Sequence, residues 1–369
     1  MHRKPIFYVL FFIIIIGATS CKKKNSNGTS ATVDSIRIVK QNLQHVWEIL
    51  WGPDDHIWFT ERDGKISKMD PASGTIVFNA TINEVVSSGE GGLLGMALHP
   101  DFLNNGLLYV VYNYSGTSGY REKLVRYTFS NNSITNPTTI IDNIAASSIH
   151  NGSRIRVVNE NTGVKIYLTT GDASNSSIAQ DVNARNGKVL RLNGDGTVPS
   201  DNPIAGNPVW SYGHRNPQGL VFVNNKLYES EHGPDIEDEL NIIEKGRNYG
   251  WPNVNGPCNS TEATFCTTNN VKEPIWSSGG STIAVCGIDY YNSDKIPEWK
   301  NSILMTTLKD ASLRQLKLST DGNSVVSTSI YFKDVYGRLR DICISPSGNV
   351  YICTSNGGND DKIIEIPKL

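Results

Sequence analysis

The body of the chain lacks a long basic block, and the formal net charge is −2. Proteins that bind nucleic acid need clustered positive charge to meet the phosphate backbone, so the composition gives that class no support. Zinc-type spacings are absent as well, because the sequence has no Cys-x-x-Cys pair and no His-rich run. The chain is rich instead in glycine, with 33 residues, and in Asn, Ser and Thr. This composition predicts turn-rich β-structure.

No apolar run is long enough to cross a bilayer comfortably. The run IFYVLFFIIII has 11 residues and follows the positive segment MHRK, an arrangement typical of a signal peptide. GATSC comes next, and small residues before a cysteine resemble a lipoprotein signal, although Ala18 stands where leucine is usual. An ordinary cleaved signal peptide is the alternative.

The N-terminus also predicts the organisation of the chain. We expect residues 1–20 to be a lipoprotein-type signal peptide, 21–34 a flexible polar tether and 35–369 a single folded domain. Cys21 would carry the lipid and would provide the only attachment to a membrane. The expected location is therefore the cell envelope, facing the periplasm or at the outer membrane.

The cysteines of the domain predict one disulfide. Export places the domain in an oxidising compartment. Besides Cys21, five cysteines remain, and an odd number excludes complete pairing within the chain. Cys258 and Cys266 flank the polar loop NSTEATF, so we predict a disulfide between them. The pairing of the other three stays open.

A strand-turn-strand pattern recurs along the chain, with no helical periodicity between the copies. HIWFTERDGKISKMD (56–70) and SILMTTLKDASLRQLKL (302–318) both combine an apolar strand, a polar turn and an alternating strand. Six similar strand cores surround the bulky residues Trp58, Tyr109, Tyr167, Tyr228, Leu304 and Tyr351. Six units of about 50 to 60 residues predict an all-β fold, a six-bladed β-propeller that forms one domain. A β-sandwich array is the alternative.

Loops of several repeats carry polar groups next to the predicted strands. In a propeller, one end of each innermost strand faces a common mouth, so residues far apart in the sequence can meet there. A single His or Arg is more often structural than functional, and only the set as a whole carries weight. The candidates are Glu90, His150, Asp172, Arg215, Asn216, the carbonyls of Gly233 and Pro234, Thr282, Lys309, Arg338 and Arg340.

The chemistry of this set indicates a particular kind of ligand. Three arginines and one lysine are joined by a His with a candidate Asp partner and by a turn rich in oxygen atoms. Arginine offers two-pronged hydrogen bonds to carboxylates, and carbonyl and carboxylate oxygens suit Ca²⁺. The set therefore predicts a mouth for a planar polyanion and a hard cation.

Four longer motifs are more specific: GHRNPQGL, EHGP…DELN…KGRNYGWPNV, GLLGMALHPDF and GKVLRLNGDGTVPSDNP. Over about residues 35 to 369 the chain resembles the soluble pyrroloquinoline-quinone-dependent sugar dehydrogenases, the glucose/sorbosone dehydrogenase family, and most resembles its aldose sugar dehydrogenases. That family has a six-bladed propeller, in agreement with the repeats. The resemblance implies oxidation of an aldose at C1 to the lactone, with hydride transfer to pyrroloquinoline quinone and with Ca²⁺ bound beside it.

The resemblance also implies a role for each candidate. His150 matches the general base, and Asp172 matches the carboxylate that orients it. The carbonyls of Gly233 and Pro234 match ligands of the calcium that polarises the quinone. Glu239 with the Tyr249 carbonyl matches a second, structural calcium site. The residues that would hold the quinone are Glu90, Arg215, Asn216, Thr282, Lys309, Arg338 and Arg340.

Some positions depart from the family pattern. Glu90 stands where the best-studied members have Gln, and an acid beside a polycarboxylate lowers affinity unless it is protonated or paired with a cation. His232 replaces a Gln of some members, and STIAVCG lacks a proline that some relatives have. These departures leave open a non-catalytic, calcium-bearing propeller lipoprotein that binds carbohydrate or protein. A propeller lactone hydrolase is less favoured, because it has no quinone carboxylates for the Arg and Lys cluster to neutralise. The implied partners are a small sugar and an electron acceptor that the motifs do not specify.

Overall fold

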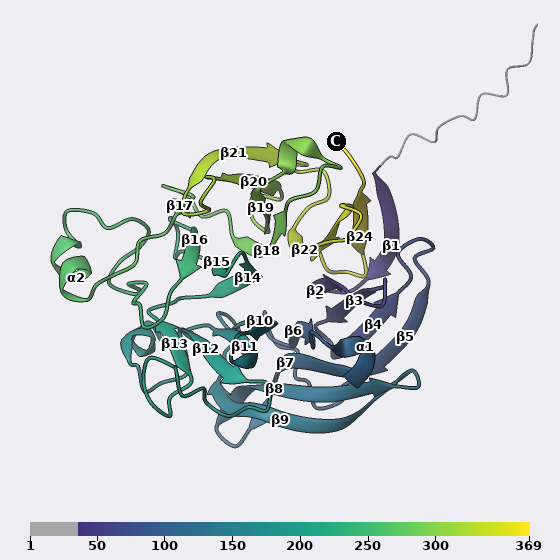
Figure 1. Cartoon of the computed structure of the whole chain (residues 1–369), viewed down its shortest axis with the longest axis horizontal. Coiled ribbons are helices and arrows are strands. Elements are labelled where there is room, and N and C mark those ends of the chain that lie inside the picture. The colour runs from purple at the N-terminus through teal and green to yellow at the C-terminus, as the bar shows by residue number, and fades with distance from the viewer. Residues whose placement is uncertain (1–35) are drawn as a thin grey trace, which may run out of the picture. The chain divides into compact units, whose positions relative to one another are not determined.

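Six sheets of four strands each form a ring around a central axis (Figure 1). The computed structural model describes residues 36–369 of the chain. Within each sheet every pair of neighbouring strands is antiparallel. The predicted all-β fold, a six-bladed β-propeller, is confirmed.

The first three blades follow the chain in order, and each is named here from its innermost strand outward. The first contains β2 (Val46–Trp51), β3 (Ile57–Glu61), β4 (Lys65–Met69) and β5 (Ile76–Thr81). The second contains β6 (Leu93–Leu98), β7 (Leu107–Gly116), β8 (Gly119–Ser130) and β9 (Ser133–Ala145). The third contains β10 (Gly152–Glu160), β11 (Gly163–Thr170), β12 (Lys188–Asn193) and β13 (Val209–Tyr212).

The last three blades complete the ring. The fourth contains β14 (Pro217–Val223), β15 (Lys226–Glu231), β16 (Glu239–Ile243) and β17 (Trp276–Ser277). The fifth contains β18 (Val285–Tyr291), β19 (Ser302–Thr307), β20 (Leu313–Leu318) and β21 (Val325–Tyr331). The sixth contains β22 (Leu339–Ile344), β23 (Val350–Thr354), β24 (Asp361–Ile366) and β1 (Arg37–Leu43). Short helical turns are α1 (Phe102–Asn105), η1 (Ser176–Gln180), α2 (Ala263–Thr268) and η2 (Pro297–Trp299).

The two ends of the described chain close the ring together. β1 pairs with β24, so the first strand supplies the outer edge of the last blade. The Arg37 guanidinium adds an ion pair to Glu365 at 2.7 Å. Because the first and last blades are joined by this pairing, the propeller cannot open at that seam without losing a row of backbone hydrogen bonds.

The six repeat residues predicted from the sequence all occupy equivalent places. Each lies in the second strand of its blade and is buried: Trp58, Tyr109, Tyr167, Tyr228, Leu304 and Tyr351. Fully burying a large apolar side chain stabilises a fold by roughly 1.5–3 kcal/mol. The repeated bulky residue therefore marks the core that holds each blade against its neighbour.

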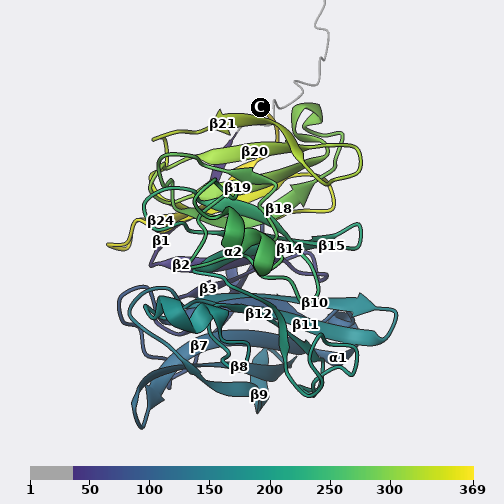
Figure 2. The same ribbon diagram turned by 90° about the vertical axis from the view of Figure 1, so that its left-hand side faces the viewer.

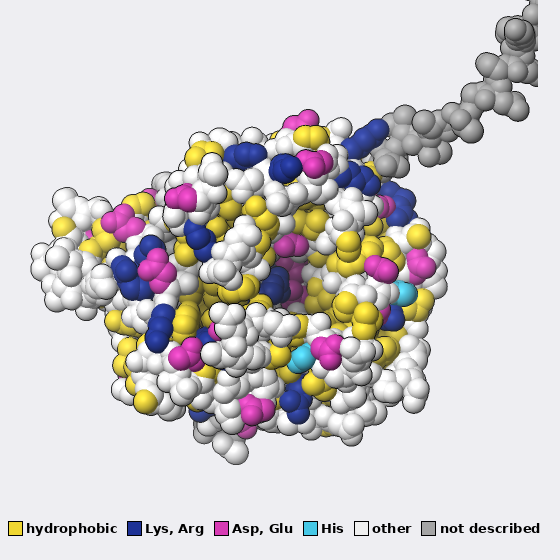
Figure 3. Space-filling view, viewed as in Figure 1, with side chains coloured by type: hydrophobic (Ala, Val, Ile, Leu, Met, Phe, Trp, Pro, Cys, Tyr) yellow, Lys and Arg dark blue, Asp and Glu magenta, His cyan; other side chains and the backbone are white. Residues whose placement is uncertain are grey.

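Charged side chains of the innermost strands meet inside the ring. Arg154 of β10 is 0% exposed, and its Nη1 lies 2.6 Å from Glu48 of β2 and 2.9 Å from Asp341 of β22. Its guanidinium also lies 4.2 Å from the centre of the Trp47 ring. Figure 3 shows acidic and basic side chains inside the hollow at the centre of the molecule. The first, third and sixth blades are thus joined along the axis by buried ion pairs.

The strand ends next to most of the predicted site residues lie at one edge of the ring. The innermost and second strands of each blade are antiparallel, so the start of the first lies beside the end of the second. The segments before β6, β10, β14, β18 and β22 therefore share one mouth with the segments after β3, β11, β15 and β19. The predicted site residues precede or begin one of these strands or follow one of them closely, except Glu239 and Tyr249, which begin and follow β16.

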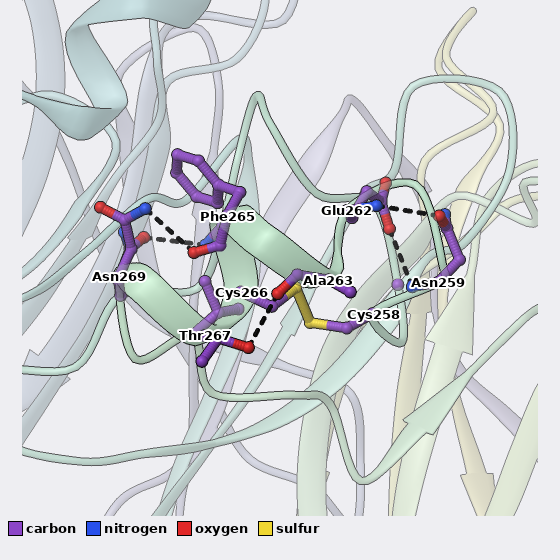
Figure 4. Close-up of a disulfide and its surroundings, with 12 residues drawn as sticks. Cys258, Asn259, Glu262, Ala263, Phe265, Cys266, Thr267 and Asn269 are labelled. Carbon is purple, nitrogen blue, oxygen red and sulfur yellow. Dashed lines mark hydrogen bonds between the residues drawn. A yellow bond between two sulfur atoms is a disulfide. The ribbon is translucent and has the colours of Figure 1, made fainter.

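A long excursion leaves the fourth blade between β16 and β17. It carries α2, which projects from the ring in Figure 1 and faces the viewer in Figure 2. A disulfide joins Cys258 to Cys266 of α2, as predicted, with the Cα atoms 6.5 Å apart (Figure 4). The Thr267 hydroxyl donates to the Ala263 carbonyl within the same turn, at 2.8 Å. The other three cysteines of the domain are buried free thiols.

The predictions for the N-terminus fall on residues that the structure does not describe. The signal peptide, Cys21 and the whole of the predicted tether lie outside the described residues. Within residues 36–369, no helix is long and apolar enough to cross a membrane.

Candidate active site

His150 and Asp172 meet at the mouth of the third blade. His150 lies in the loop before β10 with a left-handed backbone φ of 59°, and Asp172 follows β11. The His150 Nδ1 atom lies 2.9 Å from Asp172 Oδ1, and the two side chains are 16% and 2% exposed. Since Nδ1 faces a carboxylate, the Nδ1–H tautomer is favoured, and the Nε2 lone pair is left free. The pair can therefore accept a proton from a hydroxyl group in the mouth.

The segment WSYGHRNPQGL turns sharply between β13 and β14. Gly213 has a φ of 79°, and a Cβ there would lie 2.3 Å from Asn248 Oδ1, so the turn requires glycine. His214 points inward and is fully buried, with Nε2 2.8 Å from the Ser211 hydroxyl. Burial and the nearby Lys188 lower the pKa of His214 to about 3, so it is a neutral core residue.

Arg215 and Asn216 are the residues of the turn between β13 and β14, called the corner below, that lie at the mouth. The Arg215 carbonyl accepts the Asp172 backbone N–H at 2.8 Å, and the Asn216 Oδ1 accepts the Gly152 N–H at 3.2 Å. The corner is therefore hydrogen-bonded to the strand ends on either side of His150. Arg215 Nε and Asn216 Nδ2 are buried but have no hydrogen-bond partner. Burial lowers the pKa of Arg215, although Asp172 opposes the effect.

Three further arginines and one acid gather across the mouth. Arg340 is 5% exposed, and its Nη1 donates to Gln218 at 2.6 Å and lies 3.2 Å from the Cys286 sulfur. Arg62 donates to the Gly89 carbonyl at 2.6 Å. Burial and the field of Arg340 lower the pKa of both Arg62 and Arg338. The negative charge of Glu90 opposes this lowering of the pKa at both Arg62 and Arg338.

The loop after β15 is organised by Asp238. Its carboxylate accepts the Gly233 N–H and the Thr282 hydroxyl, each at 2.9 Å. Burial raises the pKa of Asp238, while these hydrogen bonds lower it. The Thr282 hydroxyl thus already donates a hydrogen bond to Asp238, and Thr282 helps to fix the conformation of this loop. Among the described residues, no hydrogen bond reaches the carbonyl oxygens of Gly233 and Pro234.

Buried acids line the fourth blade beside this loop. Glu239 accepts the Gly256 N–H at 2.8 Å and the Asn241 amide at 2.9 Å. Glu229 and Glu231 lie on the neighbouring strand β15. Burial raises the pKa of all three glutamates, and the negative charge of Glu231 raises that of the other two. A narrow cavity beside them is lined by Glu239, Tyr249, Trp251 and Glu231. A cation there would allow Glu239 to ionise.

Lys309 and Arg338 differ from the other predicted residues. Both are exposed at the mouth, and no hydrogen bond from either side chain occurs within the described part of the chain. The Lys309 backbone N–H donates to the Ile283 carbonyl at 3.1 Å, which places it next to Thr282. These two side chains are therefore free to reach a ligand above the mouth.

Two residues of the mouth were missed in the sequence. Arg62 follows β3 four positions after Trp58, close to the place where Asp172 follows Tyr167. Aligning the repeats on their bulky residues could have found it. Trp251 lies within the motif KGRNYGWPNV, but the motif did not indicate its contact, because an irregular segment after β16 carries it to the Asp172 carboxylate of the neighbouring blade.

The orphaned polar atoms of the mouth fit the ligands that the resemblance implied. The buried atoms without a partner include Nε of Arg62, Arg215 and Arg340, Nδ2 of Asn216, Oε2 of Glu90 and Nε2 of His232. Buried donors are nearly always satisfied in folded proteins, so such a cluster of donors indicates an absent acceptor. Arginine forks match the carboxylates of a polyanion. The free carbonyls of Gly233 and Pro234 are hard oxygen ligands suited to Ca²⁺.

A separate pocket of about 420 Å³ lies at the other ends of the innermost strands. Trp51, Leu98 and Arg156 contribute to its wall. It has only one arginine and none of the buried unpartnered arginine nitrogens. The mouth described above is therefore the better candidate for the active site.

Comparisons with known proteins find relatives over nearly the whole chain. A model of the glucose/sorbosone dehydrogenase family matches residues 43–365. Quinoprotein glucose dehydrogenase B of Acinetobacter calcoaceticus is 30% identical over 415 residues, covering 88% of this chain and 86% of the relative. Aldose sugar dehydrogenase YliI of Escherichia coli is 29% identical over 376 residues, covering 98% of each. The solved structure of the PQQ-bound aldose sugar dehydrogenase of Streptomyces coelicolor gives a TM-score of 0.75 at 28% identity, covering 90% of this chain and 97% of that one.

The family match spans nearly the whole propeller, from the end of β1 to the penultimate residue of β24. The named relatives are sugar dehydrogenases by name, and the solved Streptomyces structure shares the fold described here. The chain belongs to the glucose/sorbosone dehydrogenase family.

Proposed function

We propose that the protein is a quinoprotein aldose dehydrogenase, which oxidises an aldose at C1 to the lactone with hydride transfer to pyrroloquinoline quinone. The observation that carries the proposal is the cluster of buried, unpartnered arginine nitrogens beside the His150–Asp172 pair. A polyanion held by the arginines would lie next to a side chain that can accept a proton. Oxidation of a hemiacetal needs a base for the hydroxyl proton and an acceptor for the hydride, and a quinone held by the arginines would be that acceptor.

The arginines and their neighbours would bind the quinone. Arg215 and Asn216 would meet it from the fourth blade, and Arg340, Arg338 and Lys309 from the sixth and fifth. When bound, the quinone supplies the group that accepts the hydride. An arginine can present two parallel N–H donors to a carboxylate, which would fix the orientation of the quinone as well as adding affinity.

His150 would remove the proton of the anomeric hydroxyl. Its Nε2 has no hydrogen-bond partner among the described residues, and its Nδ1 is held by Asp172 at 2.9 Å. Asp172 keeps the free lone pair on the ring atom that faces the mouth and stabilises the imidazolium that forms. The proton of the hydroxyl would thus be taken up by the His150–Asp172 pair.

Calcium is proposed at two places. The carbonyl oxygens of Gly233 and Pro234 would hold the ion that polarises the quinone, as the resemblance implies. Glu239 and the Tyr249 carbonyl would hold a second, structural ion. The free carbonyls and the buried Glu239 carboxylate support these assignments.

Glu90 is the observation that favours the rival function, a calcium-bearing propeller that binds carbohydrate or protein without catalysis. An unpartnered carboxylate oxygen in the mouth would repel the carboxylates of the quinone. The fields of Arg62, Arg215 and Arg338 offset that repulsion, because each guanidinium feels the charge of Glu90. We therefore retain the enzymatic proposal.

Reconstitution decides between the two functions. Purified protein is loaded with pyrroloquinoline quinone and Ca²⁺, then assayed with a panel of aldoses and an artificial electron acceptor. The proposal expects sugar-dependent dye reduction that needs both additions. Stoichiometric sugar binding without any reduction would instead establish the non-catalytic propeller.

The location is also a proposal. The signal-like N-terminus supports export, with lipid on Cys21 as the anchor in the cell envelope. Mass spectrometry of the mature protein tests it, and an unmodified N-terminus at another residue would contradict the lipid anchor.

A further inference from the structure

Trp251 contacts the oxygen of Asp172 that His150 leaves free. Its indole Nε1 donates to Asp172 Oδ2 at 2.9 Å, while Oδ1 receives His150 Nδ1 at 2.9 Å and the Ser174 backbone N–H at 2.8 Å. The carboxylate is therefore held from both sides. An indole N–H can only donate, so the Asp172 oxygen that it meets acts as an acceptor.

The segment that carries Trp251 is fixed by the third blade. The Trp251 backbone N–H donates to the Gly213 carbonyl at 3.0 Å, and its carbonyl accepts the Gln180 amide at 2.6 Å. Gln180 also exchanges two amide hydrogen bonds with Asn248, at 3.0 and 2.8 Å. Trp251 is therefore held in place before any ligand arrives.

The indole also touches the proposed quinone site. The Arg215 guanidinium lies 5.3 Å from the centre of the Trp251 ring, within the range of a cation–π contact. The Arg215 carbonyl accepts the Asp172 N–H at 2.8 Å. One aromatic side chain thus contacts both the acid that orients His150 and an arginine of the binding cluster.

We propose that Trp251 is a positioning residue, which fixes the Asp172 carboxylate so that His150 presents its free nitrogen to the mouth. The inference rests on the proposed function for its effect on turnover, but not for its effect on His150 itself. Without the indole N–H, Oδ2 would be buried without a partner, and the whole negative charge would act on the imidazole. The carboxylate would also be freer to turn.

The test compares Trp251→Phe with Trp210→Phe. Both indoles are partly buried, and the Trp210 nitrogen donates no hydrogen bond within residues 36–369, so Trp210→Phe is the matched control. In protein free of quinone, the His150 ring signals are followed by NMR from pH 4 to 9, assigned with His150→Gln. Trp251→Phe is expected to move the titration midpoint of the His150 ring to higher pH, with Trp210→Phe unchanged. An unmoved midpoint in Trp251→Phe overturns the proposal.

Kinetics of the reconstituted protein provide the second readout. Trp251→Phe is expected to lower kcat about tenfold with little change in KM, and to move the acid limb of the pH–rate profile upward. Equal losses in kcat and in quinone affinity would indicate a packing role only and would count against positioning. If the parent protein oxidises no sugar, the proposed function fails, and the NMR result alone decides the role of Trp251.

A further measurement needs no Trp251 variant, in case Trp251→Phe does not fold. Hydrogen exchange of the indole N–H is measured in the parent and in Asp172→Ala, because the amide oxygen of Asn could still accept this hydrogen bond. Loss of the carboxylate should speed the exchange of this one proton at least tenfold, relative to the other indoles. Unchanged exchange would overturn the proposal.

Discussion

His150 Nδ1 lies 2.9 Å from Asp172 Oδ1, although 22 residues separate the two in the chain. The contact forms because the loop before β10 and the end of β11 lie at the same edge of one antiparallel blade. The mouth of the third blade thus holds an imidazole whose second nitrogen is free. Its role as a base can be tested separately from the fold.

His150→Ala should keep the fold and the bound quinone and lose most of the sugar-dependent reduction. Removal of a positioned base lowers turnover by on the order of 10²–10⁴-fold. Asp172→Asn should show a smaller loss of the same kind, since the ring can then adopt the wrong tautomer. Steady-state kinetics with an artificial acceptor measure both. A His150→Ala protein with the parental rate would exclude this residue as the base.

Arg338→Ala should weaken quinone binding at least tenfold and leave the melting temperature of the quinone-free protein nearly unchanged. Arg338 is exposed and donates no side-chain hydrogen bond within the described residues, so the fold loses little. The loss of a charged partner by a carboxylate in a partly desolvated site lowers the binding free energy by roughly 2–5 kcal/mol. Equilibrium titration of quinone fluorescence measures the affinity. Lys300→Ala, which removes an exposed cation paired with Asp294, is the control. Equal affinity in Arg338→Ala and the parent would mean that the basic cluster serves another ligand.

Glu239→Gln should reduce the stabilisation that Ca²⁺ gives the parent protein. A ligand present at 100 times its Kd stabilises the folded state by about 2.7 kcal/mol, so the effect is measurable as a rise in melting temperature. Gln retains the size of the side chain but removes the charge that attracts the ion. Scanning calorimetry with and without a chelator measures the difference, and Glu298→Gln on the exposed surface is the matched control. The same calcium-dependent rise in Glu239→Gln would refute this ligand assignment.

The buried carboxyl group of Glu122 should cause the free energy of unfolding to fall as the pH rises. Burial raises the pKa of Glu122 to about 8, although the Ser153 hydroxyl donates to it and opposes the shift. The unfolded chain releases this proton near pH 4.5 and the folded chain only near pH 8, so the folded state is favoured at low pH. Stability should therefore fall between these two values, by on the order of a few kcal/mol.

Glu122→Gln should remove the share of that pH dependence that Glu122 contributes, while the buried glutamates of the fourth blade keep theirs. Urea unfolding at pH 5 and pH 8.5 measures the free energy of unfolding of the variant and the parent. Glu298→Gln again controls for a change of charge at the surface. A slope that persists unchanged in Glu122→Gln would show that another buried acid causes it.

The arrangement of the strands was readable from the sequence because its signals are local. The alternation of each hairpin and the bulky residue of each second strand, such as Trp58 or Tyr351, lie within a few neighbouring residues. The same holds for Cys258 and Cys266, which are eight residues apart. The family motifs then selected most of the mouth residues, since the motifs lie at the strand ends that a propeller brings together.

Only the tertiary structure decided which side chains touch across blades. In the folded protein His214 is buried in the core, where it contacts the Ser211 hydroxyl. Arg62 of the first blade lies close enough to Arg340 of the sixth for the charge of Arg340 to lower its pKa. The Trp251 indole donates a hydrogen bond to Asp172. The tertiary structure also paired β1 with β24, joining Arg37 to Glu365 across 328 residues. Strand and turn patterns specify which backbone groups pair within a blade. Contacts between blades depend on how six blades rotate about one axis and close, and no short stretch of sequence records that geometry.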